Sequence, residues 1–128
     1  MAIVLYARKS VERENSISCE TQLEYCRMMI KPDERSEKVI EIVDNGFSGG
    51  NINRDGLQKM MKLIRQGKVK KVIVYKLDRI SRSMKDFVDM IQEFKAHGVE
   101  FVSSQESFDT SASYGEMLMQ LMMKRMKV

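Results

Sequence analysis

The stretch Val4-Leu5-Tyr6-Ala7-Arg8-Lys9-Ser10 decides the fold expected for this chain. Residues 3–5 form a short continuous apolar run, which is what a strand buried in a parallel sheet requires. Open α/β sheets hold their ligands at the carboxyl ends of such strands, so Arg8 and Ser10 are predicted to lie at the mouth of a cleft. A serine in this place can be a nucleophile aimed at a phosphate, or it can cap a helix or form a turn.

The composition is typical of one compact domain. The 128 residues are 43% apolar and 31% charged, with one proline and seven glycines. No segment is apolar for long enough to span a bilayer, and the first residues lack the basic leader of a secretory signal, so we expect a cytoplasmic protein. The net charge of +4 indicates an anionic partner only mildly. Lys68, Lys70 and Lys71 form one of several basic clusters, which are either solvated or contacts for an anion.

The sequence offers no evident set of metal ligands. Cys19 and Cys26 lie seven positions apart on an expected helix. That spacing separates them by about 10 Å, which is too far for a disulfide, so reduced thiols are expected. His97 is the one histidine. A zinc site is therefore not expected, and no cofactor is implied.

Strand patterns alternate with helix patterns along the chain. After the first strand, strands are expected at residues 38–44, 69–75 and 99–103, and helices at 18–30, 55–66 and 84–97. Ser18 and Asp55 are predicted to cap the first two helices. This alternation predicts right-handed βαβ units, and hence an α/β fold of three layers. Its mostly parallel sheet of four to five strands would carry helices on both faces.

A last helix is expected from Tyr114 to the end of the chain, and it is apolar on more than one face. One face can pack on the sheet domain, whereas the other needs a partner helix or a missing segment. The first face consists of Met117, Leu118, Leu121 and Met122, and the second of Met119, Met123 and Met126. The alternative is a plain core helix in a chain that is cut short.

Three polar loops follow the first three expected strands and carry residues suited to phosphate chemistry. They contain Arg8 and Ser10, then Ser48, Gly49 and Arg54, then Asp78, Arg79 and Arg82. Neighbouring arginines repel each other unless an anion lies among them, and guanidinium groups match phosphate oxygens in geometry and charge. The loops therefore predict a phosphodiester site, in which arginines can stabilise the transition state without a metal ion.

These spaced motifs resemble the catalytic domain of the serine recombinases, the resolvase and invertase superfamily. The matching motifs are Tyr6-Ala7-Arg8-Lys9-Ser10, Gln22, Asp44-Asn45-Gly46-Phe47-Ser48-Gly49 with Arg54 and Leu57, and Tyr75-Lys76-Leu77-Asp78-Arg79-Ile80-Ser81-Arg82-Ser83. The polar segments 11–17 and 106–110 are more similar to the large serine recombinases of transposons and phages than to the short resolvases.

The resemblance implies a nucleophile and a phosphate-binding set. Ser10 would attack the scissile phosphate, forming a 5′-phosphoserine link and freeing a 3′-hydroxyl. The phosphate and its transition state would be bound by Arg8, Arg79 and Arg82, supported by Arg54, which is also one candidate to help deprotonate Ser10.

The resemblance implies that the remaining site residues orient the nucleophile and the arginines around it. Asp78 would hold an arginine in place or, alternatively, act as general acid, and an ordinary aspartate pKa near ~3.9 favours the first role. Gln22 and Tyr6 would orient the residues around the phosphate, and Ser48 and Gly49 would shape their loop. Plain packing or capping is the alternative for each of these four.

The resemblance also predicts how the chain is organised. Residues 1–113 would form the catalytic domain, and residues 114–128 would begin a long oligomerisation helix that is cut short, with the DNA-binding domain absent. The partners would be double-stranded DNA at mobile-element ends and further copies of the protein, as dimers that pair into tetramers. The methionine stripe is the predicted contact between copies.

Three other classes of protein stay open on the residues alone. A phosphate-binding module is disfavoured because neither glycine-rich nucleotide-binding signature is present. A metal-dependent nuclease would use Asp44, Asp78 and Asp109, and a chelator would abolish its cleavage. A DNA-binding protein with a decayed site is disfavoured because every polar residue that the chemistry requires is present.

Overall fold

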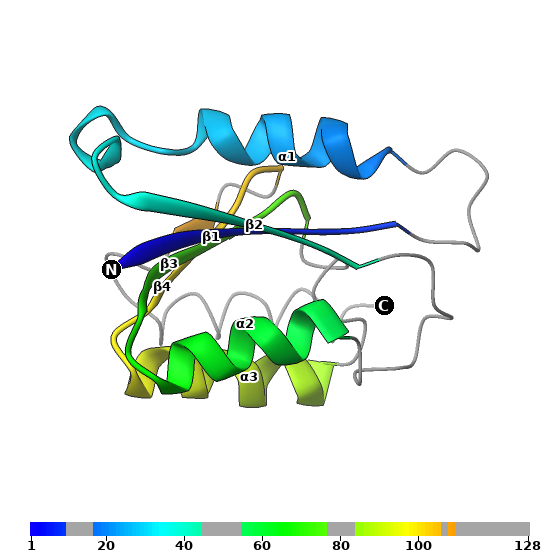
Figure 1. The fold of residues 1–128 in the computed structure, drawn as a ribbon. Coiled ribbons are helices and arrows are strands. Elements are labelled where there is room, and N and C mark those ends of the chain that lie inside the picture. The colour runs from blue at the N-terminus through cyan, green and yellow to red at the C-terminus, as the bar shows by residue number, and fades with distance from the viewer. Residues whose placement is uncertain (10–16, 45–54, 77–83, 106–107, 110–128) are drawn as a thin grey trace.

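Helices cover both faces of a mostly parallel sheet, as the alternation of patterns predicts (Figure 1). The computed structural model describes residues 1–9, 17–44, 55–76, 84–105 and 108–109. The elements are β1 (Ala2–Arg8), α1 (Cys19–Met28), the 3-10 helix η1 (Pro32–Glu34), β2 (Lys38–Asp44), α2 (Asp55–Arg65), β3 (Val69–Val74), α3 (Met84–Ala96), β4 (Glu100–Ser103) and β5 (Phe108–Asp109). None of the helices in these described ranges is long and apolar enough to cross a membrane.

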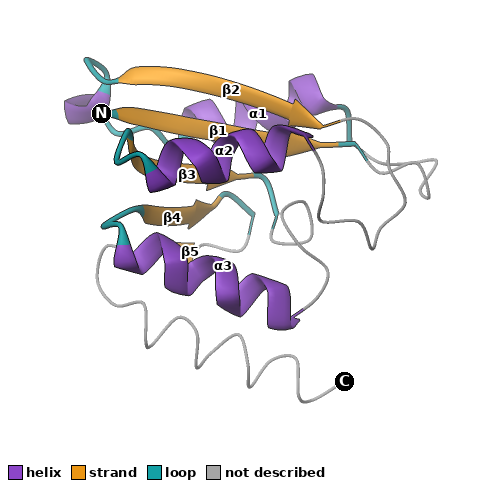
Figure 2. Ribbon diagram, turned by 60° about the horizontal axis from the view of Figure 1, so that its bottom comes forward, coloured by secondary structure: helices purple, strands orange, loops and turns teal. Residues whose placement is uncertain are grey.

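The described strands form one sheet in the order β2-β1-β3-β4-β5. The pairs β1–β2, β1–β3 and β3–β4 are parallel, whereas β5 is antiparallel to β4. The chain first moves from β1 outward to β2 and then crosses back past β1 to β3. Because the winding direction reverses between β1 and β3, α1 lies on one face and α2 and α3 lie on the other (Figure 2).

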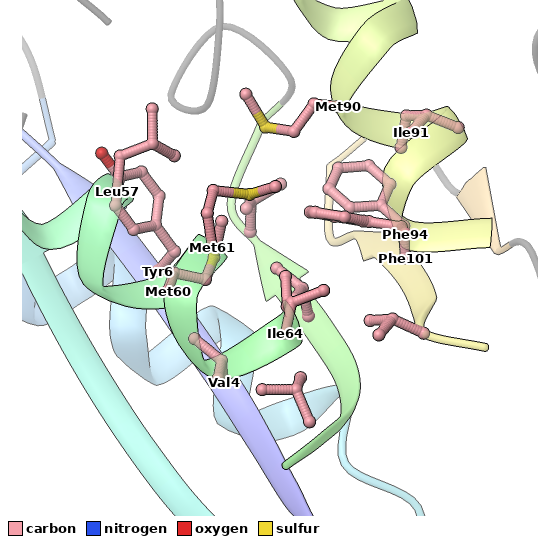
Figure 3. Close-up of a cluster of buried hydrophobic side chains, with 14 of the residues drawn as sticks. Val4, Tyr6, Leu57, Met60, Met61, Ile64, Met90, Ile91, Phe94 and Phe101 are labelled. Atoms are coloured by element: carbon pink, nitrogen blue, oxygen red, sulfur yellow. The ribbon is translucent and has the colours of Figure 1, made fainter. Parts of the chain in front are cut away.

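The larger part of the core lies between the sheet and the pair α2 and α3. Figure 3 shows Met60, Met61 and Ile64 of α2 gathered with the side chains of α3 over the sheet. Aromatic rings fill the α3 side, where Phe101 lies 5.9 Å from Phe94 between ring centroids. The 3.6-residue spacing of Phe87, Met90, Ile91 and Phe94 predicts that they form the inner side of α3, and all four are buried.

The smaller part of the core lies under α1. Ile3, Leu5 and Ala7 of β1 face Leu23 and Cys26 of α1. Burial raises the pKa of Cys26 to about 12, so this thiol is a packing group. Both cysteines are thiols, as their spacing predicts.

Most predicted boundaries are confirmed within a residue or two. Ser18 caps α1, since its Oγ accepts from the Thr21 N–H at 3.2 Å, and β2 covers the expected residues. Gly67 and Gly98 follow α2 and α3 with φ of 73° and 68°, the left-handed conformation that ends helices. The prediction that Asp55 caps α2 is wrong, because Asp55 is the first residue of the helix and the carboxylate that accepts the Gly56 and Leu57 N–H groups is that of Asp44.

Two expectations need correction or lie outside the described ranges. The polar run at residues 106–113 predicts a loop before the last expected helix, but Phe108–Asp109 form β5. A two-residue strand is too short to produce a periodic pattern, and its pairing depends on β4 being beside it. The predicted helix from Tyr114, with its methionine stripe, lies outside the described residues.

Lys71 is not part of a solvated cluster. Its side chain is 1% exposed, and its Nζ lies 2.8 Å from Oε2 of Glu34, whose side chain is 5% exposed. Glu100 lies 3.5 Å from the same Nζ, and Lys70 lies 3.6 Å from Glu34. The pair fixes η1 to the amino-terminal half of β3, away from the edge where the predicted site lies.

Candidate active site

The predicted site lies where three neighbouring parallel strands end. Arg8 at the end of β1 is in register with Asp44 at the end of β2, and Tyr6 is in register with Val74 at the end of β3. Figure 1 shows β1 and β2 running to the same edge of the sheet. The strands that precede segments 10–16, 45–54 and 77–83 therefore end side by side, and the predicted meeting of the segments themselves lies outside the described residues.

The described residues include three of the predicted site residues, Tyr6, Arg8 and Gln22. Seven others lie outside them, namely Ser10, Ser48, Gly49, Arg54, Asp78, Arg79 and Arg82. The structure therefore describes the strands and helices that flank the predicted phosphate-binding segments, together with Tyr6, Arg8 and Gln22. Arg8, the last residue of β1, is buried, with 3% of its surface exposed.

Gln22 anchors the segment that contains Ser10. Its side chain is fully buried, and its Oε1 accepts from the Arg8 N–H at 3.4 Å. Its Nε2 donates to the carbonyl oxygens of Arg8 and Ile17, each at 3.0 Å. Arg8 precedes segment 10–16 and Ile17 follows it. One side chain on α1 therefore holds both ends of the segment, which fits the predicted orienting role.

Asp44 anchors the next segment in the same way. Its carboxylate accepts from the Tyr6 hydroxyl at 2.6 Å, from the Gly56 N–H at 2.7 Å and from the Leu57 N–H at 3.0 Å. The two amides belong to the first turn of α2, where backbone donors lack helical partners and a negative charge is favoured. Segment 45–54 thus begins at this carboxylate and ends beside it.

Asp44 is the positioning residue that the sequence analysis missed. Asp44 begins the motif of residues 44–49, but the sequence suggests a role for this carboxylate only in the metal-dependent nuclease alternative. The signal in the sequence is a tyrosine directly after the apolar run of residues 3–5, because a hydroxyl in a buried strand needs a hydrogen-bond partner. Which acidic residue supplies that partner depends on the register between β1 and β2.

The same contacts weaken the metal-dependent alternative. The two oxygens of Asp44 are engaged by three protein donors. Asp78 and the side chain of Asp109 lie outside what the structure describes. In the described ranges, no group of three or more histidine, cysteine, aspartate or glutamate side chains is placed to hold a metal ion.

The two residues that follow β4 hold the chain just before segment 77–83. The Ser104 N–H donates to the Val74 carbonyl at 2.9 Å, and the Gln105 N–H donates to the Tyr75 carbonyl at 3.0 Å. The Tyr75 ring lies 5.3 Å from the Tyr25 ring of α1, and Lys76 Nζ lies 5.9 Å from the Tyr75 centroid. The chain therefore enters segment 77–83 from a fixed position.

The strand order, with its reversal between β1 and β3, defines a doubly wound α/β domain. The switch point at the carboxyl edge of such a sheet is where the site is predicted. The chain belongs to the family of resolvase N-terminal domains, since the model of the family described as "Resolvase, N terminal domain" matches residues 3–126.

Two relatives illustrate the similarity in sequence. The Tn917 transposon resolvase of Enterococcus faecalis is 39% identical over 75 residues, which are 59% of this chain and 40% of that protein. The DNA-invertase hin of Salmonella typhimurium is 36% identical over 81 residues, which are 63% of this chain and 42% of that protein. The matched part thus spans about two fifths of each relative's length.

Solved structures agree over nearly the whole chain. The N-terminal catalytic domain of TP901-1 integrase matches with a TM-score of 0.76 and 27% identity, covering 99% of this chain and 95% of that one. A resolvase family site-specific recombinase from Streptococcus pneumoniae matches with a TM-score of 0.72 and 25% identity, covering 99% and 89%. The resemblance to serine recombinases and the resolvase-like fold are thereby confirmed.

Proposed function

We propose that this chain is the catalytic domain of a serine site-specific recombinase and that Ser10 cleaves DNA. The observation that carries the proposal is the meeting of β1, β2 and β3 at one edge, with Arg8 buried there and its backbone held by Gln22. Membership of the resolvase N-terminal domain family supports it.

The proposed chemistry is a transfer of the phosphoryl group to serine and back. The Ser10 oxygen attacks phosphorus and loses its proton, while the bond from phosphorus to the 3′ oxygen breaks and that oxygen takes up a proton. The product is a 5′-phosphoserine ester with a free 3′-hydroxyl. The ester conserves the energy of the broken bond, so a 3′-hydroxyl from another strand can attack it and complete strand exchange.

Arginine side chains would stabilise the pentacoordinate transition state without a metal ion. Arg8, Arg79 and Arg82 are assigned to the phosphate oxygens, with Arg54 in support. Guanidinium groups suit this task because they stay charged and donate two parallel hydrogen bonds to an oxyanion. Asp78 is assigned to hold one of these arginines.

Four residues are assigned to positioning. Gln22 holds the ends of the segment that carries the nucleophile, and Tyr6 acts through Asp44 because its hydroxyl donates to that carboxylate. Ser48 and Gly49 are assigned to shape segment 45–54.

The partners are proposed to be double-stranded DNA at the ends of a mobile element and further copies of the protein. We assign the methionine stripe of Met119, Met123 and Met126 to the contact between copies, in dimers that pair into tetramers. Similarity to the TP901-1 integrase domain supports an integrating or excising role in the manner of the large serine recombinases. A location on the bacterial nucleoid is part of the proposal, supported by the relatives from Enterococcus faecalis and Salmonella typhimurium and by DNA as the proposed substrate.

Trapping the covalent intermediate tests the proposal. The intact protein is incubated with a supercoiled plasmid carrying the genomic DNA on both sides of its coding sequence. A protein–DNA adduct that survives detergent is expected, with the DNA attached to Ser10 in a peptide map.

Ser10→Ala should abolish the adduct, and Ser36→Ala, at an exposed serine before β2, should not. Addition of a chelator should leave adduct formation unchanged. An undiminished adduct in the Ser10→Ala protein would overturn the assignment, and loss with chelator would support the metal-dependent alternative.

A further inference from the structure

We infer that Gly56 is a positioning residue for the proposed phosphate site, because its lack of a side chain lets the first turn of α2 close onto Asp44. The inference rests on the proposed function and adds a residue to it. Gly56 donates its N–H to Asp44 Oδ1 at 2.7 Å, which is the shorter of the two bonds from α2 to that carboxylate.

There is no room for a β-carbon at this position. A Cβ built on Gly56 would lie 2.6 Å from Asp44 Oδ1 and 2.7 Å from Ile42 Cγ2. Neither neighbour can move aside easily. Asp44 and Ile42 are each 4% exposed, and the Asp44 carboxylate is held by three donors from two directions.

The glycine is not explained by backbone conformation. Gly67 and Gly98 have positive φ, but Gly56 is an ordinary helical residue of α2 and is not among the positive-φ glycines of the described ranges. Glycine in a helix costs roughly 0.5–1 kcal/mol relative to alanine. The close approach to Asp44 is what requires a glycine here.

The position of this contact links it to the proposed site. Asp44 is the residue before segment 45–54, and Gly56 follows two positions after Arg54. Both ends of the segment that carries Arg54 are thus fixed at one carboxylate, which also accepts the Tyr6 hydroxyl from β1. Tyr6 lies two residues before Arg8, so the contact joins the start of α2 to the end of β1.

Gly56→Ala should displace the first turn of α2. Bringing the built Cβ from 2.6 Å to an ordinary contact requires a shift of roughly 1 Å, and a misplacement of that size costs about 100-fold in rate when it reaches reacting groups. We expect adduct formation at saturating plasmid to slow by about 10- to 100-fold, with the affinity for DNA unchanged.

The experiment compares intact wild-type, Gly56→Ala and Gly98→Ala proteins in the adduct assay on the plasmid described above. Gly98 has φ of 68° and open space around it, so alanine there strains the backbone at the opposite edge of the sheet. It serves as the control for loss of stability alone. Amide hydrogen exchange at Leu57, whose N–H also bonds Asp44, reports the local contact directly.

The outcomes separate the two proposals. Slow adduct formation with faster exchange at Leu57 in Gly56→Ala, but not in Gly98→Ala, supports the positioning role. A wild-type rate in Gly56→Ala, or equal slowing in both variants, overturns that role while the recombinase function stands. No adduct from the wild-type protein overturns the proposed function itself.

Discussion

Gln22 and Arg8 are joined by two hydrogen bonds of opposite direction, from the Arg8 N–H to Gln22 Oε1 at 3.4 Å and from Gln22 Nε2 to the Arg8 carbonyl at 3.0 Å. A side chain on α1 thereby bonds to the end of β1 as a neighbouring strand would. Gln22 and Asp44 act in the same way. Each is a buried polar side chain that holds the two ends of one segment at the carboxyl edge of the sheet, Gln22 for segment 10–16 and Asp44 for segment 45–54. A rigid framework of this kind suits chemistry that depends on placing charged groups around one phosphorus atom.

Gln22→Glu should destabilise the domain by about 3 kcal/mol. The substitution keeps the shape of the side chain but replaces the Nε2 donor with an oxygen that faces the carbonyls of Arg8 and Ile17. Urea unfolding at neutral pH measures the change. Gln92→Glu, on the exposed side of α3, is the matched control, and equal unfolding midpoints for the two variants would contradict the anchoring role.

Tyr6→Phe should cost about 1.5–3 kcal/mol, the range for a hydrogen bond to a charged group. The variant removes the 2.6 Å donor to Asp44 and leaves the ring in the core. Tyr25→Phe, at a ring that is 39% exposed, should change the free energy of unfolding little. If the Tyr6 variant were as stable as the Tyr25 variant, the hydroxyl would have no part in holding Asp44.

Lys71→Met should destabilise the domain by about 3–5 kcal/mol, because it leaves the buried Glu34 carboxylate without its main cation. Lys70→Met removes a cation that is 3.6 Å from Glu34 and 35% exposed, so its effect should be below about 1 kcal/mol. The double substitution Lys71→Met with Glu34→Leu should recover most of the loss. A double variant as unstable as Lys71→Met alone would refute the ion-pair explanation.

The ion pair between Glu34 and Lys71 also predicts that the domain loses stability in acid. Burial alone would raise the pKa of Glu34, but the Lys71 ammonium, the Lys31 N–H and the charge of Lys70 together hold that pKa below its ordinary value. Stability from this group is therefore fully present above the unfolded-state pKa of about 4.3 and is lost as the pH falls through the lower folded-state pKa.

The contribution of Glu34 to stability is measured by urea unfolding of the wild type and of Glu34→Gln at a series of pH values above and below the pKa of this carboxyl. The difference in the free energy of unfolding between the two proteins should shrink as the pH falls through the folded-state pKa of Glu34. A difference that stays constant with pH would show that Glu34 is not responsible for the loss.

The order of strands and helices could be predicted from sequence because each element carries a local signal. The apolar run at residues 3–5, the β-branched residues of β2 and the 3.6-residue spacing in α2 and α3 do not depend on distant residues. Ser18 was also predictable, since a cap bonds to an amide three residues away. β5 was not, because two residues have no period.

Local sequence patterns are enough to predict the element order, the placement of polar motifs after three strands and the resemblance that predicts their chemistry. Which buried polar groups meet is known only from the folded domain. Tyr6 and Asp44 are 38 positions apart, and Glu34 and Lys71 are 37 apart. The sequence alone therefore leaves Lys71 in a basic cluster that is either solvated or in contact with an anion, and it does not show the space that Gly56 must leave open. Such contacts depend on strand order, register and helix docking, which the sheet sets as a whole and no local pattern records.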